Sequence, residues 1–102
     1  MTKLNDTTFH AFVRATERPL LVDFATAWCP PCKTQKPILE KFASDHPDVD
    51  VVYVDLDESP ELASTYEVQA VPTLMLFVAG EKKAVAQGLQ YAARINALLA
   101  GA

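Results

Sequence analysis

Two cysteines carry the most reactive side-chain chemistry in this 102-residue chain. Cys29 and Cys32 are its only cysteines, and only Pro30 and Pro31 stand between them. Because residues three positions apart lie one helical turn from each other, the two sulfurs can bond without straining the backbone. A pair with this spacing can cycle between dithiol and disulfide, or it can supply part of a zinc site.

The other residues of the chain do not favour zinc. A structural zinc ion needs about four nitrogen or sulfur ligands. The only histidines, His10 and His46, fall in one predicted helix and at the end of another. A purely structural disulfide is also disfavoured, because so close a pair cannot clamp distant parts of a fold. The spacing therefore predicts redox chemistry without a metal.

The elements predicted around the pair would activate it. Leu20–Ala25 is a short, nearly continuous apolar run, typical of a strand buried on both faces. A helix is expected from the cysteines to about Asp45, ending before Pro47. Free N–H groups and the positive end of the dipole at a helix N-terminus stabilise a thiolate. We therefore expect Cys29, at the N-cap and nearer to solvent, to attack, and Cys32, more deeply buried, to resolve.

The residues next to the cysteines determine which hydrogen bonds and charges stabilise the Cys29 thiolate. Pro30 and Pro31 are tolerated because the N–H groups of a first helical turn would be unpaired anyway. Since prolines donate no hydrogen bond, the Cys29 sulfur is expected to depend on the amides of Cys32 and Lys33. The charge of Lys33 either strengthens this positive field or lies on an exposed helix face.

Asp23 interrupts the apolar strand before the cysteines. Burial of a charged carboxylate is costly, so the pKa of Asp23 is expected to rise. That makes it a candidate proton acceptor for Cys32 when a mixed disulfide resolves. The alternative is an inert, hydrogen-bonded aspartate at a strand end. On the following helix, Lys36 is expected to lie on an exposed face.

Apolar periodicity and turn residues predict strands that alternate with helices along the rest of the chain. The other expected elements are a very short first strand at 2–4, a helix over 5–17 capped by Asn5 or Asp6, a strand over 49–56, a helix over 61–66 capped by Ser59, a strand over Thr73–Val78, a turn over 79–82, a strand over 84–87, and a helix from Leu89 onward. This order predicts an α/β fold with a central sheet covered on both faces and an antiparallel last pair of strands.

Several segments resemble the thioredoxin family in order and spacing. They are Val22-Asp23-Phe24, the run from Ala27 through the cysteine motif to Lys33, Val54-Asp55-Leu56-Asp57, Leu62-Ala63 with Tyr66, and Val71-Pro72-Thr73. The resemblance covers nearly the whole chain. It implies one thioredoxin domain over residues 1–102, with a central mixed sheet flanked on both faces by helices. It also supports the proton-accepting role of Asp23.

The same resemblance implies a surface for substrate peptides. A cis bond before Pro72 would be rare on frequency alone, but the matching proline of the family is cis and packs beside the cysteines. Val71 would then offer its backbone to an extended substrate. Gly88 stands where the family has a glycine on this surface, or it merely links a strand to a helix. Trp28 is expected to shield the cysteines rather than to fill the core. It would also form an apolar wall of a docking surface with Pro30, Val71 and Pro72.

Four positions depart from the family pattern. Pro30 replaces a glycine, which makes the motif similar to the longer tryparedoxins and nucleoredoxins. Ala25 stands where an aromatic residue is usual, removing cover above Asp23. Tyr53 stands where many members have a lysine near the buried aspartate, and Ala70 replaces a glycine in the substrate-facing loop. These changes leave the expected reaction class the same, but the sequence then predicts neither the redox potential nor the choice of partner.

Composition limits the partners and the location. The formal net charge is −4, and the sequence has no run of basic residues that could bind along a phosphate backbone. Nucleic acid is therefore not an expected partner. No apolar run approaches the ~18 residues that cross a membrane, and the start resembles no signal peptide. The expected compartment is the cytoplasm, and the expected state is a monomer.

Together these inferences predict a protein disulfide reductase without a tightly bound cofactor. The resemblance implies that an NADPH-dependent thioredoxin reductase recharges it. Two alternatives remain open at this point. One is a disulfide oxidase or isomerase poised at higher potential, and the other is a thioredoxin-fold binding or chaperone subunit whose cysteine chemistry is incidental.

Overall fold

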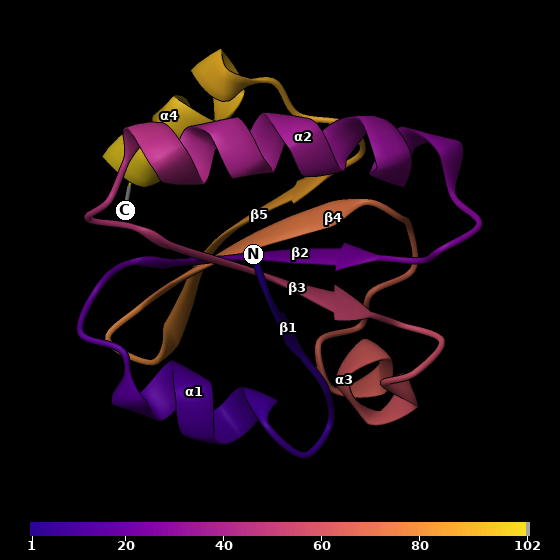
Figure 1. Cartoon of the computed structure of the whole chain (residues 1–102). Helices are drawn as coiled ribbons and strands as arrows, with labels where there is room; N and C mark the ends of the chain where they lie inside the picture. The colour runs from indigo at the N-terminus through magenta and orange to yellow at the C-terminus, as the bar shows by residue number, and fades with distance from the viewer. Residues whose placement is uncertain (102) are drawn as a thin grey trace.

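The computed structural model describes residues 1–101 and contains a five-stranded mixed sheet with four helices (Figure 1). In chain order the elements are β1 (Thr2–Leu4), α1 (Phe9–Ala15), β2 (Leu20–Ala25), α2 (Pro30–Asp45), β3 (Asp50–Asp55), α3 (Pro60–Thr65), β4 (Thr73–Val78), β5 (Glu81–Gln87) and α4 (Ala92–Ala100). The strand order is β1-β3-β2-β4-β5. β1, β3 and β2 run parallel, whereas β4 and β5 are antiparallel to their neighbours, as predicted for the last pair. Within these residues no helix is long and apolar enough to cross a membrane.

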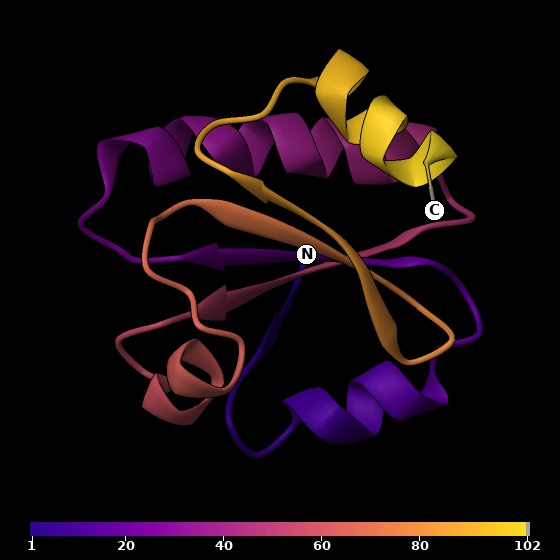
Figure 2. The same cartoon turned by 180° about the vertical axis from the view of Figure 1, so that it is seen from behind.

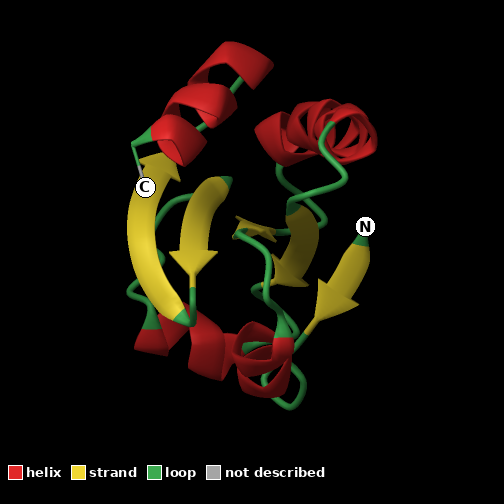
Figure 3. Ribbon diagram, turned by 90° about the vertical axis from the view of Figure 1, so that its left-hand side faces the viewer, coloured by secondary structure: helices red, strands yellow, loops and turns green. Residues whose placement is uncertain are grey.

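The helices cover both faces of the sheet. α2 and α4 lie on one face, and α1 and α3 lie on the other, as Figures 1 and 2 show from opposite sides. Figure 3 shows the same layers along the sheet. Because successive side chains of a strand point to opposite faces, β2 supplies both apolar cores. Its residues Leu20, Val22 and Phe24 pack in the core under α1 and α3, whereas Leu21 packs with Leu39 of α2.

The first helix is shorter than predicted. α1 begins at Phe9, not at residue 5, because the Asn5 side chain closes a turn before it. The Asn5 Oδ1 atom accepts hydrogen bonds from the N–H groups of Thr7 and Thr8, at 2.9 and 3.0 Å. Asparagine side chains often bond to a backbone N–H two residues ahead and so compete with helix formation.

Asp6 does not cap α1 either. Its carboxylate accepts hydrogen bonds from the N–H groups of Glu61 and Leu62, at 3.2 and 2.9 Å, at the start of α3. Ser59 occupies the N-cap position of α3, as predicted, but its buried hydroxyl has no hydrogen-bond partner within the described residues. The cap of α3 therefore comes from a segment that precedes it by 55 residues.

The last hairpin is tighter than predicted. Ala79 and Gly80 both have positive φ, 53° and 81°, which is the pattern of a two-residue hairpin turn. β5 therefore begins at Glu81 rather than at residue 84. α4 begins at Ala92, later than expected, because the backbone of Gln90 bonds to a side chain of α2 instead of to a helical turn.

Candidate active site

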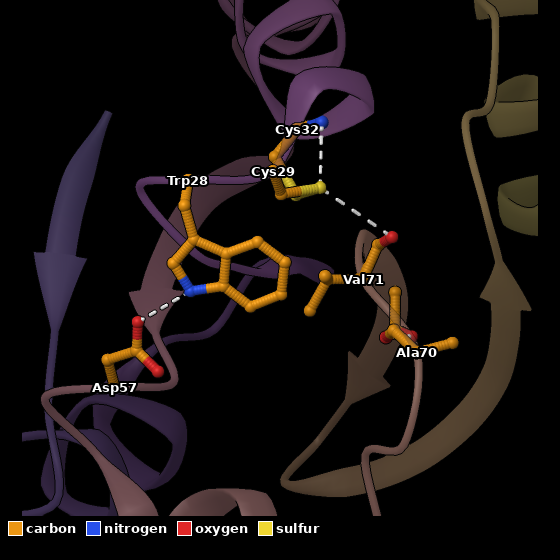
Figure 4. The surroundings of a disulfide bond; sticks show 7 residues. Trp28, Cys29, Cys32, Asp57, Ala70 and Val71 are labelled. Atoms are coloured by element: carbon orange, nitrogen blue, oxygen red, sulfur yellow. Dashed lines mark hydrogen bonds between the residues drawn. A yellow bond between two sulfur atoms is a disulfide. The ribbon is translucent and has the colours of Figure 1, made fainter.

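The end of β2 and the start of α2 place the two cysteines, which form a disulfide with Cα atoms 5.2 Å apart (Figure 4). Cys29 is the N-cap of α2 and has an extended backbone, as predicted. Its sulfur accepts the N–H of Cys32 at 3.3 Å. The N–H of Lys33 bonds to the carbonyl oxygen of Cys29, not to its sulfur, so one of the two expected sulfur contacts is absent.

The two cysteines are buried to nearly the same extent. Cys29 is 3% exposed and Cys32 is 5% exposed, so the expectation that Cys29 lies nearer to solvent is wrong for this disulfide form. The reason is the loop before β4, which covers the first cysteine. The carbonyl oxygen of Val71 lies 3.7 Å from the Cys29 sulfur (Figure 4).

The peptide bond between Val71 and Pro72 is cis, as the resemblance implied. Pro72 is buried and Val71 is half-buried. The N–H of Gly88 donates to the Pro72 carbonyl oxygen at 2.8 Å, which brings the segment after β5 against this loop. Gly88 has a φ of +83°, a conformation that favours glycine. The fold therefore brings Val71, Pro72 and Gly88 together beside the cysteines.

Trp28 stands out from the surface beside the disulfide. Its side chain is 67% exposed, so it does not fill the core. The indole Nε1 donates to a carboxylate oxygen of Asp57 at 3.0 Å, which orients the ring (Figure 4). In the sequence, Asp57 belongs to the family segment Val54-Asp55-Leu56-Asp57, which predicts no contact with Trp28. Its contact spans 29 residues, and no local pattern points to it.

Asp23 lies in β2 on the face covered by α2. It is 2% exposed, and its Oδ1 atom has no hydrogen-bond partner within the described residues. Burial raises the pKa of Asp23 to about 7, as expected in direction. The alternative of a carboxylate held inert by hydrogen bonds does not fit the unpartnered Oδ1 atom.

A cavity of about 270 Å³ connects Asp23 with the second cysteine. Asp23, Cys32 and Ala25 all line it, so the small side chain of Ala25 does leave space over the carboxyl group. The hydroxyl of Thr26, another lining residue, also lacks a partner within the described residues. Cavities with unpaired polar atoms of this kind can hold water, so the carboxyl group has a route to solvent beside Cys32.

Tyr53, which like Ala25 departs from the family pattern, also lies at this cavity. It lines the cavity together with Lys36 of α2, and the Lys36 ammonium lies 5.2 Å from the centre of the tyrosine ring. This distance is within the range of a cation–π contact. Lys36 lies on an exposed helix face, as expected, and it also contacts the Tyr53 ring. Lys33 and both prolines of the motif are exposed.

Residues 1–101 contain no group of three or more histidine, cysteine, aspartate or glutamate side chains placed to hold a metal ion. The absence of a metal and of a tightly bound cofactor stays a prediction. The chemistry that the site does offer is a disulfide at a helix N-terminus, next to a half-buried carbonyl and a buried carboxyl group.

Comparison with known families identifies this arrangement. The family model described as thioredoxin matches residues 1–101. The chain belongs to the thioredoxin family. It is 39% identical over 98 residues to a thioredoxin of Alicyclobacillus acidocaldarius, covering 95% of this chain and 92% of the relative. As a thioredoxin-family member with its cysteine pair at disulfide distance, it is a thiol–disulfide oxidoreductase that performs dithiol–disulfide exchange.

Two further relatives bear on the fold and on possible partners. The crystal structure of mitochondrial thioredoxin 3 from Saccharomyces cerevisiae, in its oxidized form, is 36% identical with a TM-score of 0.89, covering 98% of this chain and 94% of that one. This similarity confirms the predicted thioredoxin fold.

A bifunctional thioredoxin reductase/thioredoxin of Mycobacterium leprae is 39% identical over 80 residues, covering 78% of this chain and 18% of the relative.

Proposed function

We propose that this oxidoreductase is a protein disulfide reductase in which Cys29 attacks and Cys32 resolves. The observation that carries the proposal is the position of the Cys29 sulfur. It caps α2, accepts the N–H of Cys32, and lies beside the Val71 carbonyl. A thiolate at this place is stabilised by the helix N-terminus, and an extended substrate bound along Val71 would reach it.

The proposed reaction moves two electrons from the dithiol to the substrate. The Cys29 thiolate attacks one sulfur of the substrate disulfide, and the other substrate sulfur leaves as a thiolate that takes up a proton. Cys32, once deprotonated, attacks the Cys29 sulfur of the mixed disulfide. The Cys29–Cys32 disulfide forms, and the second substrate sulfur leaves as a thiolate. The substrate is reduced to two thiols and the protein is oxidised.

Asp23 is proposed to accept the proton of Cys32 in the second step. Both groups line the same cavity, and a pKa of about 7 suits a base that works near neutral pH. Water in the cavity would relay the proton between them and to solvent. The Lys36 and Tyr53 side chains would border that water.

The exposed indole of Trp28 and Pro30 are proposed to form one wall of the docking surface, with Val71, Pro72 and Gly88 as the other. The Val71 backbone would pair with an extended substrate in the manner of an added strand. Pro31 and Lys33 would complete the first turn of α2, with the Lys33 charge adding to the positive field on the Cys29 sulfur.

We further propose a single domain over residues 1–102, a monomer, a cytoplasmic location and a role in electron transport. An NADPH-dependent thioredoxin reductase would restore the dithiol. The support for this partner is the Mycobacterium leprae relative, whose name joins a thioredoxin reductase and a thioredoxin in one protein. No tightly bound cofactor is needed, because the cysteine pair itself holds the electrons.

Substitution of each cysteine tests the proposed order of attack. Cys29→Ser is expected to abolish the reduction of insulin, since the attacking sulfur is lost. Cys32→Ser is expected to stop the reaction at a mixed disulfide between Cys29 and an insulin chain, because nothing resolves it. Mass spectrometry of the mixture detects this adduct. An adduct on Cys32 in the Cys29→Ser protein instead would reverse the proposed roles.

The redox potential separates a reductase from an oxidase or isomerase. Equilibration with glutathione buffers of known ratio, followed by trapping of free thiols, measures it. A potential near that of reducing thioredoxins, about −270 mV, is expected, whereas a value of about −200 mV or higher would support the oxidase or isomerase. A chaperone or binding activity that remains when alanine replaces both cysteines would instead favour a thioredoxin-fold binding or chaperone subunit.

A further inference from the structure

Gln35 is the fully buried polar side chain on the cysteine-bearing helix, three positions after Cys32. Its Nε2 atom donates to the carbonyl oxygen of Gln90 at 2.9 Å, and its Oε1 atom accepts the Gln90 N–H at 2.8 Å. Both hydrogen bonds therefore go to the backbone of one residue, 55 positions further along the chain. We call this pair of bonds the Gln35 clamp.

A carboxamide matches both bonds of the Gln35 clamp. A primary amide offers a donor and an acceptor side by side, as a neighbouring peptide group would. The Gln90 N–H needs an acceptor and the Gln90 carbonyl needs a donor, which also sets the orientation of the side chain. An aliphatic residue would satisfy neither group, and a carboxylate would satisfy only the N–H.

The Gln35 clamp holds the segment that connects β5 with α4. This segment, residues 88–91, belongs to neither element. The Gln90 side chain adds hydrogen bonds to the carbonyl oxygens of Gln87 and Gly88, at 3.0 and 3.2 Å. The backbone of the 88–91 segment is thus bonded to α2 at Gln90. The Gln90 side chain also bonds back to the start of the same segment.

The segment in turn holds the loop that faces the disulfide. The Gly88 N–H donates to the Pro72 carbonyl oxygen at 2.8 Å. One residue earlier, the Val71 carbonyl oxygen lies 3.7 Å from the Cys29 sulfur (Figure 4). A continuous route of hydrogen bonds therefore runs from Gln35 on α2 through Gly88 to the loop opposite Cys29.

We propose that Gln35 is a positioning residue for the exchange reaction with protein disulfides. The Gln35 clamp fixes the 88–91 segment on α2, and Gly88 then fixes Val71 at the distance where a docked substrate strand presents its sulfur to Cys29. This proposal rests on the proposed reductase function. A disulfide too small to pair with the Val71 backbone does not use the route.

The test compares two substrates in single turnovers of the fully reduced protein. For Gln35→Met, the rate constant with insulin is expected to fall at least about tenfold, because small misplacements of a docked reactant are costly. The rate constant with hydroxyethyl disulfide is expected to stay the same. The control variant is Glu40→Met, which places the same side chain at an exposed position of α2 outside the Gln35 clamp; wild-type rates are expected for both substrates.

A role in stability alone would give a different result. Equal losses with both substrates, no loss with insulin, or the same loss in Glu40→Met would each overturn the proposal. If Gln35→Met does not fold, Gln35→Asn takes its place, because its carboxamide is one methylene shorter and cannot keep both bonds to the Gln90 backbone at hydrogen-bond distance. The same difference between the two substrates is expected from it.

Hydrogen exchange distinguishes this proposal from the proposed function. The Gly88 amide is expected to exchange faster in Gln35→Met than in the wild-type protein, and no change there would contradict the Gln35 clamp. This readout does not depend on activity. Failure of the wild-type protein to reduce insulin would instead count against the reductase function itself.

Discussion

Asp23 shows how one residue can be costly for the fold and useful for the chemistry. Its carboxyl group lies on the α2 face of β2, 2% exposed, with one oxygen unpartnered within the described residues. Burial favours the neutral acid, which raises the pKa to about 7. The cavity over Ala25 gives the group access to water and to Cys32. A proton can therefore leave and return at neutral pH.

The raised pKa of Asp23 predicts a pH-dependent stability. The unfolded chain ionises this group near 3.8 and the folded chain near 7, so the folded state binds the proton more tightly. The free energy of unfolding of the oxidised protein should therefore fall as the pH rises through this window, by up to about 4 kcal/mol from this group. Asp23→Asn removes the dependence.

Urea unfolding of both oxidised proteins across this pH range measures the difference. Asp23→Asn is expected to gain stability relative to the wild-type protein as the pH rises toward 7, with a constant advantage above it. A constant difference over the whole range would show that Asp23 does not change its charge there.

At the scale of elements, short helices in this protein depend on partners outside themselves. α3 has six residues, and its own N-cap serine makes no capping bond. Asp6 supplies the cap instead, and its negative charge also suits the positive end of a helix. The turn that Asn5 closes is what brings Asp6 to that position.

This cap predicts different effects on stability for two similar substitutions. Asp6→Ala should lower the free energy of unfolding by about 1 kcal/mol, because two N–H groups of α3 lose their acceptor. Ser59→Ala, the matched change at the N-cap itself, should leave stability unchanged or raise it, because the buried hydroxyl makes no hydrogen bond. Urea unfolding at neutral pH compares them, and a larger loss in Ser59→Ala would contradict the assignment.

At the scale of the whole molecule, the aromatic cluster of the core and the cysteine chemistry lie on opposite faces of the sheet. Phe9, Phe24, Tyr66 and Phe77 form an aromatic cluster under α1 and α3, with ring centres 5.5 to 6.2 Å apart. The cysteines belong to α2 on the other face (Figure 1).

Phe9→Leu tests this separation. Loss of ring contacts in the aromatic cluster should lower the free energy of unfolding by about 1–3 kcal/mol. The rate of insulin reduction per folded molecule should stay that of the wild-type protein, because the sheet lies between Phe9 and the site. Thermal unfolding and single-turnover rates at a temperature where both proteins are folded provide the measurement. A matching fall in rate would mean that the two faces are coupled.

Local patterns in the sequence determined much of this protein. The spacing of Cys29 and Cys32 indicated a disulfide, the apolar run before them predicted β2, and the break in that run by Asp23 indicated a buried carboxyl group. Each of these inferences depends on neighbours within one turn or one strand, where backbone geometry and burial follow directly from residue type. The resemblance to the thioredoxin family added the cis bond at Pro72, which local frequencies disfavour.

The tertiary structure decided which distant groups each polar side chain meets. Asp6 caps α3 rather than α1, Asp57 orients Trp28, and Gln35 bonds to Gln90. It also decided that Cys29 and Cys32 are buried to nearly the same extent, with the Val71 carbonyl oxygen 3.7 Å from the Cys29 sulfur. The sequence could not determine these contacts, because a hydrogen bond requires two groups at about 3 Å and only the folded chain brings residues 29 to 55 positions apart to that distance.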